Sequence, residues 1–209
     1  MERLFPLIFV LLWSSAFISS KFIVLEATPF AALVFRFVLV AGGFALVCLW
    51  QRERLAAPLR DVSAAALSGV LFHGLYLGGV FYAVMAGFPT GLAALVVSLQ
   101  PIITGALAGP LLGEAVTRRQ WLGLVLGFSG AALVLGLDLG SSLPLIGFFA
   151  AVIALLGVTG ATLWQKKQSA NLALPVSNFW QAAAACLFHL LIMLLLEPAR
   201  AAMQLVDVS

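Results

Sequence analysis

Charged side chains are scarce in this chain: Asp, Glu, Lys and Arg make up 9% of its 209 residues, whereas 63% are hydrophobic. The mean hydropathy is +1.14. A soluble domain of this length does not have enough interior to bury that much apolar surface, so a soluble globular protein is excluded. The net charge of +3 carries no nucleic-acid signal, because the Lys and Arg residues lie mainly in short gaps between apolar runs.

Cysteine is equally scarce. Cys48 and Cys186 lie in separate apolar runs without metal-type spacing, which predicts neither a disulfide framework nor a zinc site. The sequence also lacks a phosphate-binding glycine loop with lysine and a clustered nucleophile, base and acid. We therefore expect neither an enzyme nor an ATP-driven pump, and no metal or other cofactor. No carboxylate lies near the middle of any apolar run, so proton coupling through a central carboxylate has no obvious residue.

The apolar residues form seven runs, each close to the ~20 residues that span a ~30 Å hydrocarbon core. They are Leu4–Val24, Pro29–Trp50, Val62–Ala86, Pro89–Leu112, Gln120–Leu137, Pro144–Trp164 and Pro175–Leu196. Such long, unalternating runs predict α-helices, since lipid offers no partner for an open backbone. The expected fold class is an all-α polytopic membrane helix bundle. Lys21, and not a small-residue cleavage site, stands near the end of the first run, which favours a retained helix over a signal peptide.

Basic residues outside the runs indicate how the chain crosses the membrane. With a cytoplasmic N-terminus, all of them except Arg200 lie on the cytoplasmic side, and the opposite orientation would leave Arg200 alone there. The positive-inside rule therefore predicts a cytoplasmic N-terminus and, with seven spans, an external C-terminus.

Glycines recur at every fourth position in two consecutive runs between Gly91 and Gly136. They are Gly105, Gly109 and Gly113 in the first run and Gly123 and Gly127 in the second. This spacing places them on one helix face, where a neighbouring backbone can approach closely. We interpret them as helix-packing residues and not as substrate contacts.

The last two runs loosely match the first two, with few identities. The turn after the first run carries Glu26 and faces out, whereas its counterpart carries Lys166 and Lys167 and faces in. A unit with an odd number of spans inverts when it is duplicated, as this switch of sides requires. We therefore predict a five-helix unit over residues 1–137 and two helices of a second, inverted unit over residues 138–209.

Three segments carry a family resemblance. They are Trp13 to Phe17 with Lys21, Phe35 to Phe37, and Leu99 to Gly130 with Gln100-Pro101 and Gly113-Glu114. Together they resemble the EamA-like branch of the drug/metabolite transporter superfamily, over the whole first unit and more loosely up to Gln181. The resemblance implies a multi-pass carrier of the inner membrane, built from two inverted five-helix units, ten helices in all. Since three helices of the second unit are missing here, we expect a truncated form.

Two cations lie inside the predicted helices, where a charge costs ~2.5–3.5 kcal/mol at mid-helix. Arg36 lies about seven residues into the second run, roughly 10 Å from its outer end. It is either a partner for an anionic substrate group or a structural ion-pair partner, for example of Glu26. Lys21 is closer to the outer surface, where its stem can reach the headgroups, and we favour that role over substrate contact.

Polar residues near the middle of the runs complete the predicted transport pathway. They are Trp13, Ser14, His73, Tyr76 and Gln100. His73 and Tyr76 are three residues apart and are expected to share a helix face. His73 fits a packing role better than a proton relay. Pro101 removes a backbone donor, so Gln100 and the freed carbonyl form either a binding element or a plain helix kink.

These observations leave two hypotheses for the function. The first is a transporter, or permease, for small metabolites or drugs that works by alternating access around a mid-membrane cavity. The alternative is a non-transporting or partner-dependent membrane fragment that pairs with a second copy or a complementing chain. The expected partners are the lipid bilayer and a small-molecule substrate, and Arg36 favours a substrate with an anionic group.

Overall fold

The computed structural model describes residues 8, 10–11, 14–15, 22, 28–113, 116–136, 144–167 and 171–206. Within these ranges the chain forms helices joined by turns, and no strand. Five helical stretches there are long and apolar enough to cross a membrane: Pro29–Gln51, Leu59–Met85, Thr90–Leu112, Leu145–Lys167 and Leu174–Leu196. The prediction of an all-α membrane helix bundle is confirmed. Most of the first predicted run lies outside the described residues, and the count of seven spans and the cytoplasmic N-terminus remain predictions.

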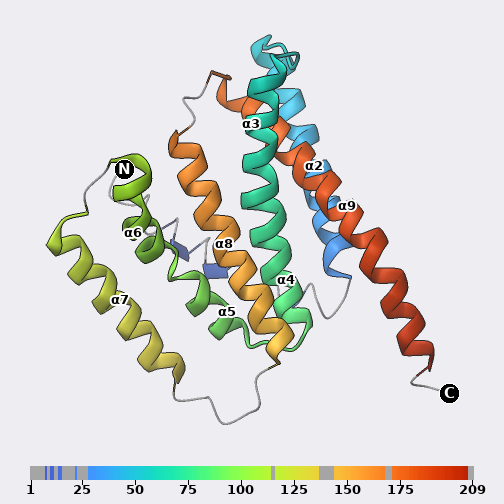
Figure 1. Cartoon of the computed structure of the whole chain (residues 1–209). Helices are drawn as coiled ribbons and strands as arrows, with labels where there is room; N and C mark the ends of the chain where they lie inside the picture. The colour runs from blue at the N-terminus through green and yellow to red at the C-terminus, as the bar shows by residue number, and fades with distance from the viewer. Residues whose placement is uncertain are drawn as a thin grey trace.

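The helices follow one another with short connections (Figure 1). They are α2 (Pro29–Gln51), α3 (Leu59–Gly69), η2 (Val70–Leu77), α4 (Gly78–Met85), α5 (Thr90–Val97), α6 (Gln100–Leu112), α7 (Arg118–Gly136), α8 (Leu145–Lys167) and α9 (Leu174–Val206). Helices α3, η2 and α4 are consecutive and form one rod, called the central helix below. Helices α5 and α6 form a second rod that is interrupted at Ser98 and Leu99.

Local sequence sets several helix ends. Pro29 occupies the first turn of α2, where its missing N–H is not needed. Gly113 closes α6 at φ 70°, a left-handed conformation that glycine adopts without strain, and its N–H bonds back to the carbonyls of Ala108 and Gly109. Lys166 and Lys167 lie in the last turn of α8, where the helix dipole stabilises positive charges.

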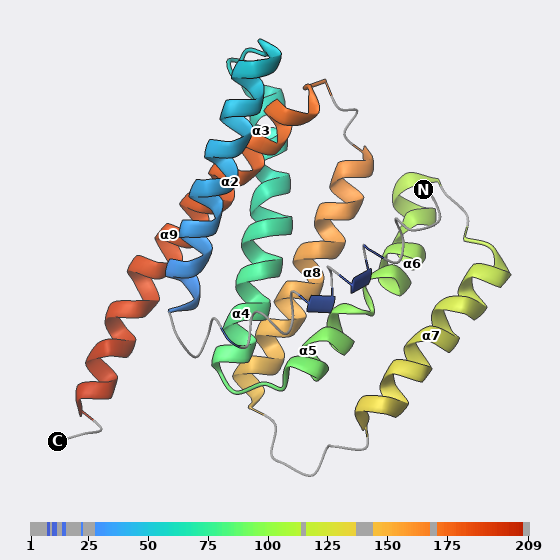
Figure 2. The same ribbon diagram turned by 180° about the vertical axis from the view of Figure 1, so that it is seen from behind.

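The central helix and α8 form the middle of the bundle. Half of the residues in the most apolar 18-residue stretch of each are buried, compared with 17% for α2, for the α5–α6 rod and for α9. Opposite views show α2 and α9 side by side on one flank and α5, α6 and α7 on the other (Figures 1 and 2). The outer helices therefore shield the two central ones.

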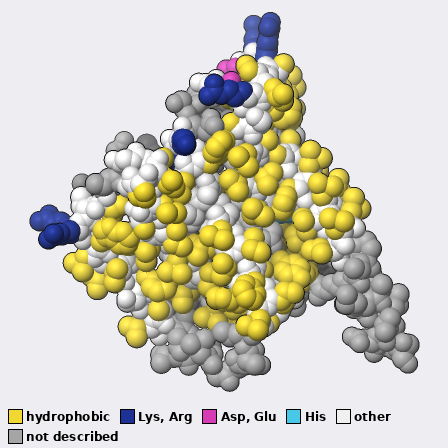
Figure 3. All heavy atoms as spheres, viewed as in Figure 1, with side chains coloured by type: hydrophobic (Ala, Val, Ile, Leu, Met, Phe, Trp, Pro, Cys, Tyr) yellow, Lys and Arg dark blue, Asp and Glu magenta, His cyan; other side chains and the backbone are white. Residues whose placement is uncertain are grey.

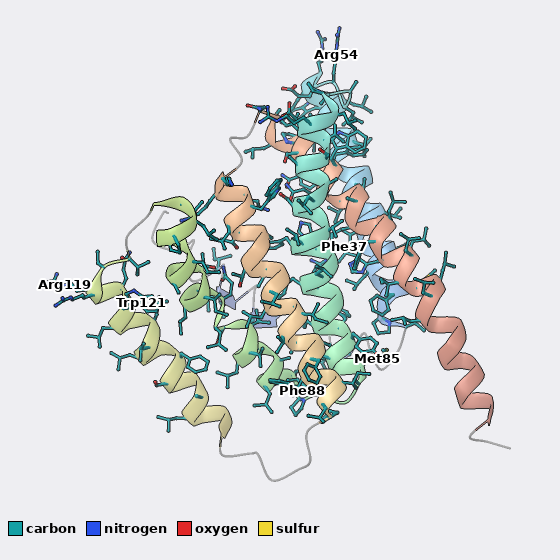
Figure 4. All side chains as sticks on the ribbon, viewed as in Figure 1. Phe37, Arg54, Met85, Phe88, Arg119 and Trp121 are labelled. Carbon is teal, nitrogen blue, oxygen red and sulfur yellow. The ribbon has the colours of Figure 1, made fainter. Side chains whose placement is uncertain are left out.

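The surface matches a membrane environment. Hydrophobic side chains cover the flanks of the helices, while Lys and Arg gather at the α2–α3 connection and at the start of α7 (Figure 3). Arg54 and Phe88 lie at opposite ends of the bundle (Figure 4). The large exposed apolar side chains, such as Leu46 and Leu133, are accordingly suited to lipid contact.

Small residues bring α8 against the central helix. A Cβ atom on Gly157 would lie 2.9 Å from the Leu71 carbonyl oxygen, and one on Gly79 would lie 2.7 Å from that of Ala150. Side chains larger than hydrogen would force these two backbones apart. The two central helices thus touch backbone to backbone at Gly157 and at Gly79.

Candidate functional site

The middle of the central helix departs from the α-helical form. Val70–Leu77 is π-helical, and π-helical turns are uncommon and occur frequently at functional sites. His73 and Tyr76 both lie in this segment, but they do not share one face as predicted. The His73 ring lies 5.2 Å from that of Phe37 in α2, whereas Tyr76 is buried in a cluster with Val158 of α8. The wider π turn separates side chains that an α-helix would align.

His189 of α9 contacts the same π-helical segment. Its side chain is fully buried, and its Nε2 lies 3.0 Å from the His73 carbonyl oxygen. Its ring stacks on Phe37 at 5.6 Å between centroids (Figure 4 labels Phe37). Gly78 provides the space for the imidazole, since a Cβ there would lie 3.2 Å from His189 Cε1. The α9 helix is therefore fastened to the central helix at mid-membrane by a histidine.

This hydrogen bond fixes the proton on the His189 ring. A carbonyl oxygen only accepts, so Nε2 carries a hydrogen and donates it to His73. The neutral ring then has a bare Nδ1, which is buried and has no hydrogen-bond partner among the described residues. An unpaired acceptor in an apolar interior is able to accept a hydrogen bond from a ligand that enters the bundle.

Gln100 forms a second polar link on the other side of the bundle. It is the first residue of α6, just after the interruption at Ser98 and Leu99, and Pro101 follows it in the first turn. Its Nε2 lies 3.2 Å from the Thr104 hydroxyl oxygen and 3.2 Å from that of Thr162 in α8. Gln100 therefore bridges α6 to α8 at the break between the two half-helices.

The remaining predicted pathway residues are more scattered. Arg36 is exposed on α2, with its guanidinium carbon 5.9 Å from the centre of the Phe37 ring. Ser14 is helical and exposed. Trp13 and Lys21 lie outside the described residues, so their predicted roles stay predictions.

Most of the glycines predicted to pack helices together are not the ones at which the helices come closest. No described atom lies within 4 Å of a Cβ placed on Gly123 or Gly127. Gly105 is the exception, because a Cβ placed there would lie 3.3 Å from Val116 Cγ2, which is a tight contact, whereas Gly113 serves as a helix cap. Gly109 is exposed in α6. Among the described residues the tightest approaches occur instead at other glycines, namely Gly69, Gly79 and Gly147.

Sequence reasoning gave little weight to His189 and overlooked Thr162. One signal was present: the chain has 2 histidines, and each lies within an apolar run. A histidine in a lipid-spanning helix is stabilised by a polar partner, so two such histidines are expected to lie near each other or near other polar groups. The position of Thr162 carries no such signal, because a hydroxyl can bond to its own helix.

The fold and this interior define a polytopic membrane protein whose spanning helices are linked by neutral polar side chains. The sequence profile described as the EamA-like transporter family matches residues 3–136, more than half of the chain. The chain belongs to this family. Its members are membrane transporters, as the resemblance in the sequence implied.

Named relatives agree with this assignment. The chain is 30% identical over 126 residues to the uncharacterized transporter YvbV of Bacillus subtilis, covering 60% of this chain and 38% of the relative. It is 32% identical over 129 residues to the uncharacterized inner membrane transporter YedA of Escherichia coli, covering 61% and 42%. It is 28% identical over 197 residues to a probable amino-acid metabolite efflux pump of Salmonella typhimurium, covering 92% and 64%.

The chain thus spans about two fifths of the length of the first two of these relatives. The inner-membrane name of one relative and the five apolar spans identify a multi-pass protein of the inner membrane.

Proposed function

We propose that this chain carries a small metabolite across the inner membrane by alternating access. The observation that carries the proposal is the pair of neutral polar links at mid-bundle, one from His189 to His73 and one from Gln100 to Thr162. Each link joins a different outer helix to a central one. Neutral groups of this kind can exchange their partners for those of a substrate without exposing a charge to lipid.

The contacts between helices support a rocking movement. Glycine and alanine line the interface between α8 and the central helix, so the two can slide without displacing large side chains. The interruption at Ser98 and Leu99 provides a hinge within the α5–α6 rod. In this proposal the pathway is lined by Trp13, Ser14, Lys21, Arg36, His73, Tyr76 and Gln100, with His189 added.

The distribution of cations supports a cytoplasmic N-terminus. Asn171 of the α8–α9 connection bonds to Asp61 at the start of α3, so this connection lies at the same end as the α2–α3 connection. The basic residues of both connections therefore gather at one end, as the positive-inside rule requires of a cytoplasmic face.

The packing of α2 on α9 supports the proposed duplication. In a pair of inverted units, over residues 1–137 and 138–209, α2 and α9 are equivalent helices. Equivalent helices next to a two-fold axis contact each other, and Phe30 and Phe37 of α2 share one core cluster with Ala182 and Ala185 of α9.

Flux through vesicles that contain only this polypeptide tests the proposal. The relative from Salmonella is named for amino-acid metabolites, so labelled amino acids and their acylated derivatives are the first substrates to load. We expect saturable efflux that falls several-fold in Gln100→Leu and is unchanged in Gly43→Ala, which alters a glycine with no atom within 4 Å of its Cβ position.

Absence of protein-dependent flux, from vesicles in which the chain is helical and monodisperse, would contradict an autonomous carrier. Cross-linking in native membranes then tests the alternative. A cross-linked pair with a second copy or another membrane chain, together with flux only from that pair, would support a partner-dependent role.

A further inference from the structure

A small pocket lies at the end of the bundle that carries the α2–α3 and α8–α9 connections. Its volume is about 200 Å³, and its walls come from the start of α3, the end of α8 and the start of α9. Its polar lining residues are Asp61, Ser68, Gln165, Asn171, Ser177 and Gln181. None of them belongs to the mid-membrane links described above.

The walls of this pocket are held in place by contacts between the three helices. The Trp164 indole N–H of α8 donates to the Ala64 carbonyl of α3 at 3.1 Å. Deeper in, Gly69 of α3 meets the backbone of Gln181, which joins α3 directly to α9. The pocket is therefore bounded by fixed helices on two sides, and a ligand does not have to order them.

Ser68 and Gln181 both keep hydrogen-bond acceptors that a ligand could use. The Ser68 hydroxyl donates to the Ala64 carbonyl at 3.2 Å, so only its lone pairs remain for a ligand. Gln181 Nε2 donates to the Ser177 hydroxyl oxygen at 3.2 Å, which leaves the Gln181 amide oxygen as an acceptor. A ligand that donates hydrogen bonds complements these two acceptors.

Asp61 adds a negative charge to these acceptors. Its half-buried carboxylate accepts a hydrogen bond from Asn171 Nδ2 at 3.1 Å, a neutral donor. The described residues that line the pocket include no Lys or Arg. The nearby cations Arg60, Lys166 and Lys167 are exposed, where water and salt screen them. The pocket therefore presents a carboxylate that a cationic ligand can approach.

We propose that this pocket binds a small organic ammonium ion, with the ammonium on Asp61 and a hydroxyl or amide tail on Ser68 and Gln181. The ammonium supplies three donors and the positive charge, which match the Asp61 carboxylate and the acceptors of Ser68 and Gln181. At about 30 Å³ for each water-sized group, the volume holds about seven non-hydrogen atoms. The site is distinct from the proposed transport pathway, and its occupation does not depend on flux.

Calorimetric titration of the full chain in detergent micelles with ethanolamine, as its ammonium ion, tests the proposal. Ethylene glycol is the neutral probe of equal size and glycolate the anionic one. We expect saturable binding of ethanolamine that is at least about tenfold weaker in Asp61→Asn, the loss of one charge-assisted hydrogen bond. Glu53→Gln is the matched control, because it removes a carboxylate at the same end but outside the pocket lining, and it should bind as the wild type does.

Three results would overturn the proposal. They are equal binding of ethanolamine by wild type and Asp61→Asn, stronger binding of glycolate or ethylene glycol than of ethanolamine, and no saturable binding to a helical, monodisperse preparation. Failure of transport in vesicles would leave the ammonium titration unaffected, so the two proposals are tested separately.

Discussion

Gly69 is the position where α3 and α9 come closest, and replacing it by alanine should separate them. A Cβ at this position would lie 2.6 Å from Gln181 Cα and 2.7 Å from the Gln181 carbonyl carbon. Ordinary contacts between carbon atoms are about 3.5–4.0 Å, so the helices must part by about 1 Å. Backbone atoms cannot rotate away, which places the cost near the upper end of the ~1–3 kcal/mol typical of overpacking.

Alanine is also more favourable than glycine inside a helix by about 1 kcal/mol, and this gain offsets part of the cost. We therefore expect Gly69→Ala to lose about 2 kcal/mol net, or about 4–8 °C in Tm. Gly43→Ala is the matched control, because nothing lies within 4 Å of its Cβ position, and it should be neutral or stabilised by up to about 1 kcal/mol. Thermal unfolding in detergent, followed by circular dichroism, measures both. Equal stability of Gly69→Ala and wild type, or an equal loss in both variants, would refute the reasoning.

Three further experiments test individual hydrogen bonds. His189→Phe keeps an aromatic ring but removes the hydrogen-bond donor to the buried His73 carbonyl, and should lose about 1–3 kcal/mol in the same unfolding assay. Unchanged stability would argue against the bond, and a loss that is merely smaller than that of His189→Leu would not be enough to support it. Gln100→Leu and Thr162→Val, combined in a double-mutant cycle, should show a coupling of about 0.6 kcal/mol, and zero coupling would argue against the link. Trp164→Phe should lose about 1 kcal/mol, whereas unchanged stability would show that its indole N–H contributes nothing.

The spanning helices could be predicted closely from the sequence. The run predicted at Pro29–Trp50 forms α2 at Pro29–Gln51, and the run predicted at Pro144–Trp164 forms α8 at Leu145–Lys167. Long apolar runs decide the structure because lipid forces the backbone to bond within its own helix. The last helix continues past the predicted end at Leu196 to Val206, although Pro198 lies within this extension. The residues after Pro198 are mostly good helix formers, including three alanines.

The candidate site was less predictable because it depends on contacts between distant segments. The residues of Val70–Leu77 look like any apolar helix, and the local sequence does not indicate a π-helix. The segment is hydrogen-bonded instead to His189, which lies 116 residues further along the chain than His73. The glycine spacing similarly indicates which residues share a face, as for Gly123 and Gly127, but not which neighbouring helix approaches that face.

The contacts along α8 determine where a rocking movement would open the bundle. At one end of α8, Trp164 is hydrogen-bonded to Ala64 of the central helix, and Asn171 of the connection that follows is hydrogen-bonded to Asp61 of the same helix. At the other end, Gly147 meets the Phe88 side chain and the Ala83 carbonyl, and among the described residues no side-chain hydrogen bond joins α8 to its neighbours there. Hydrogen bonds lost in a membrane interior are costly, whereas apolar contacts there are exchanged for equivalent contacts with lipid. Under the proposed mechanism the Trp164 end is therefore the pivot, and the Phe88 end separates when the protein changes conformation.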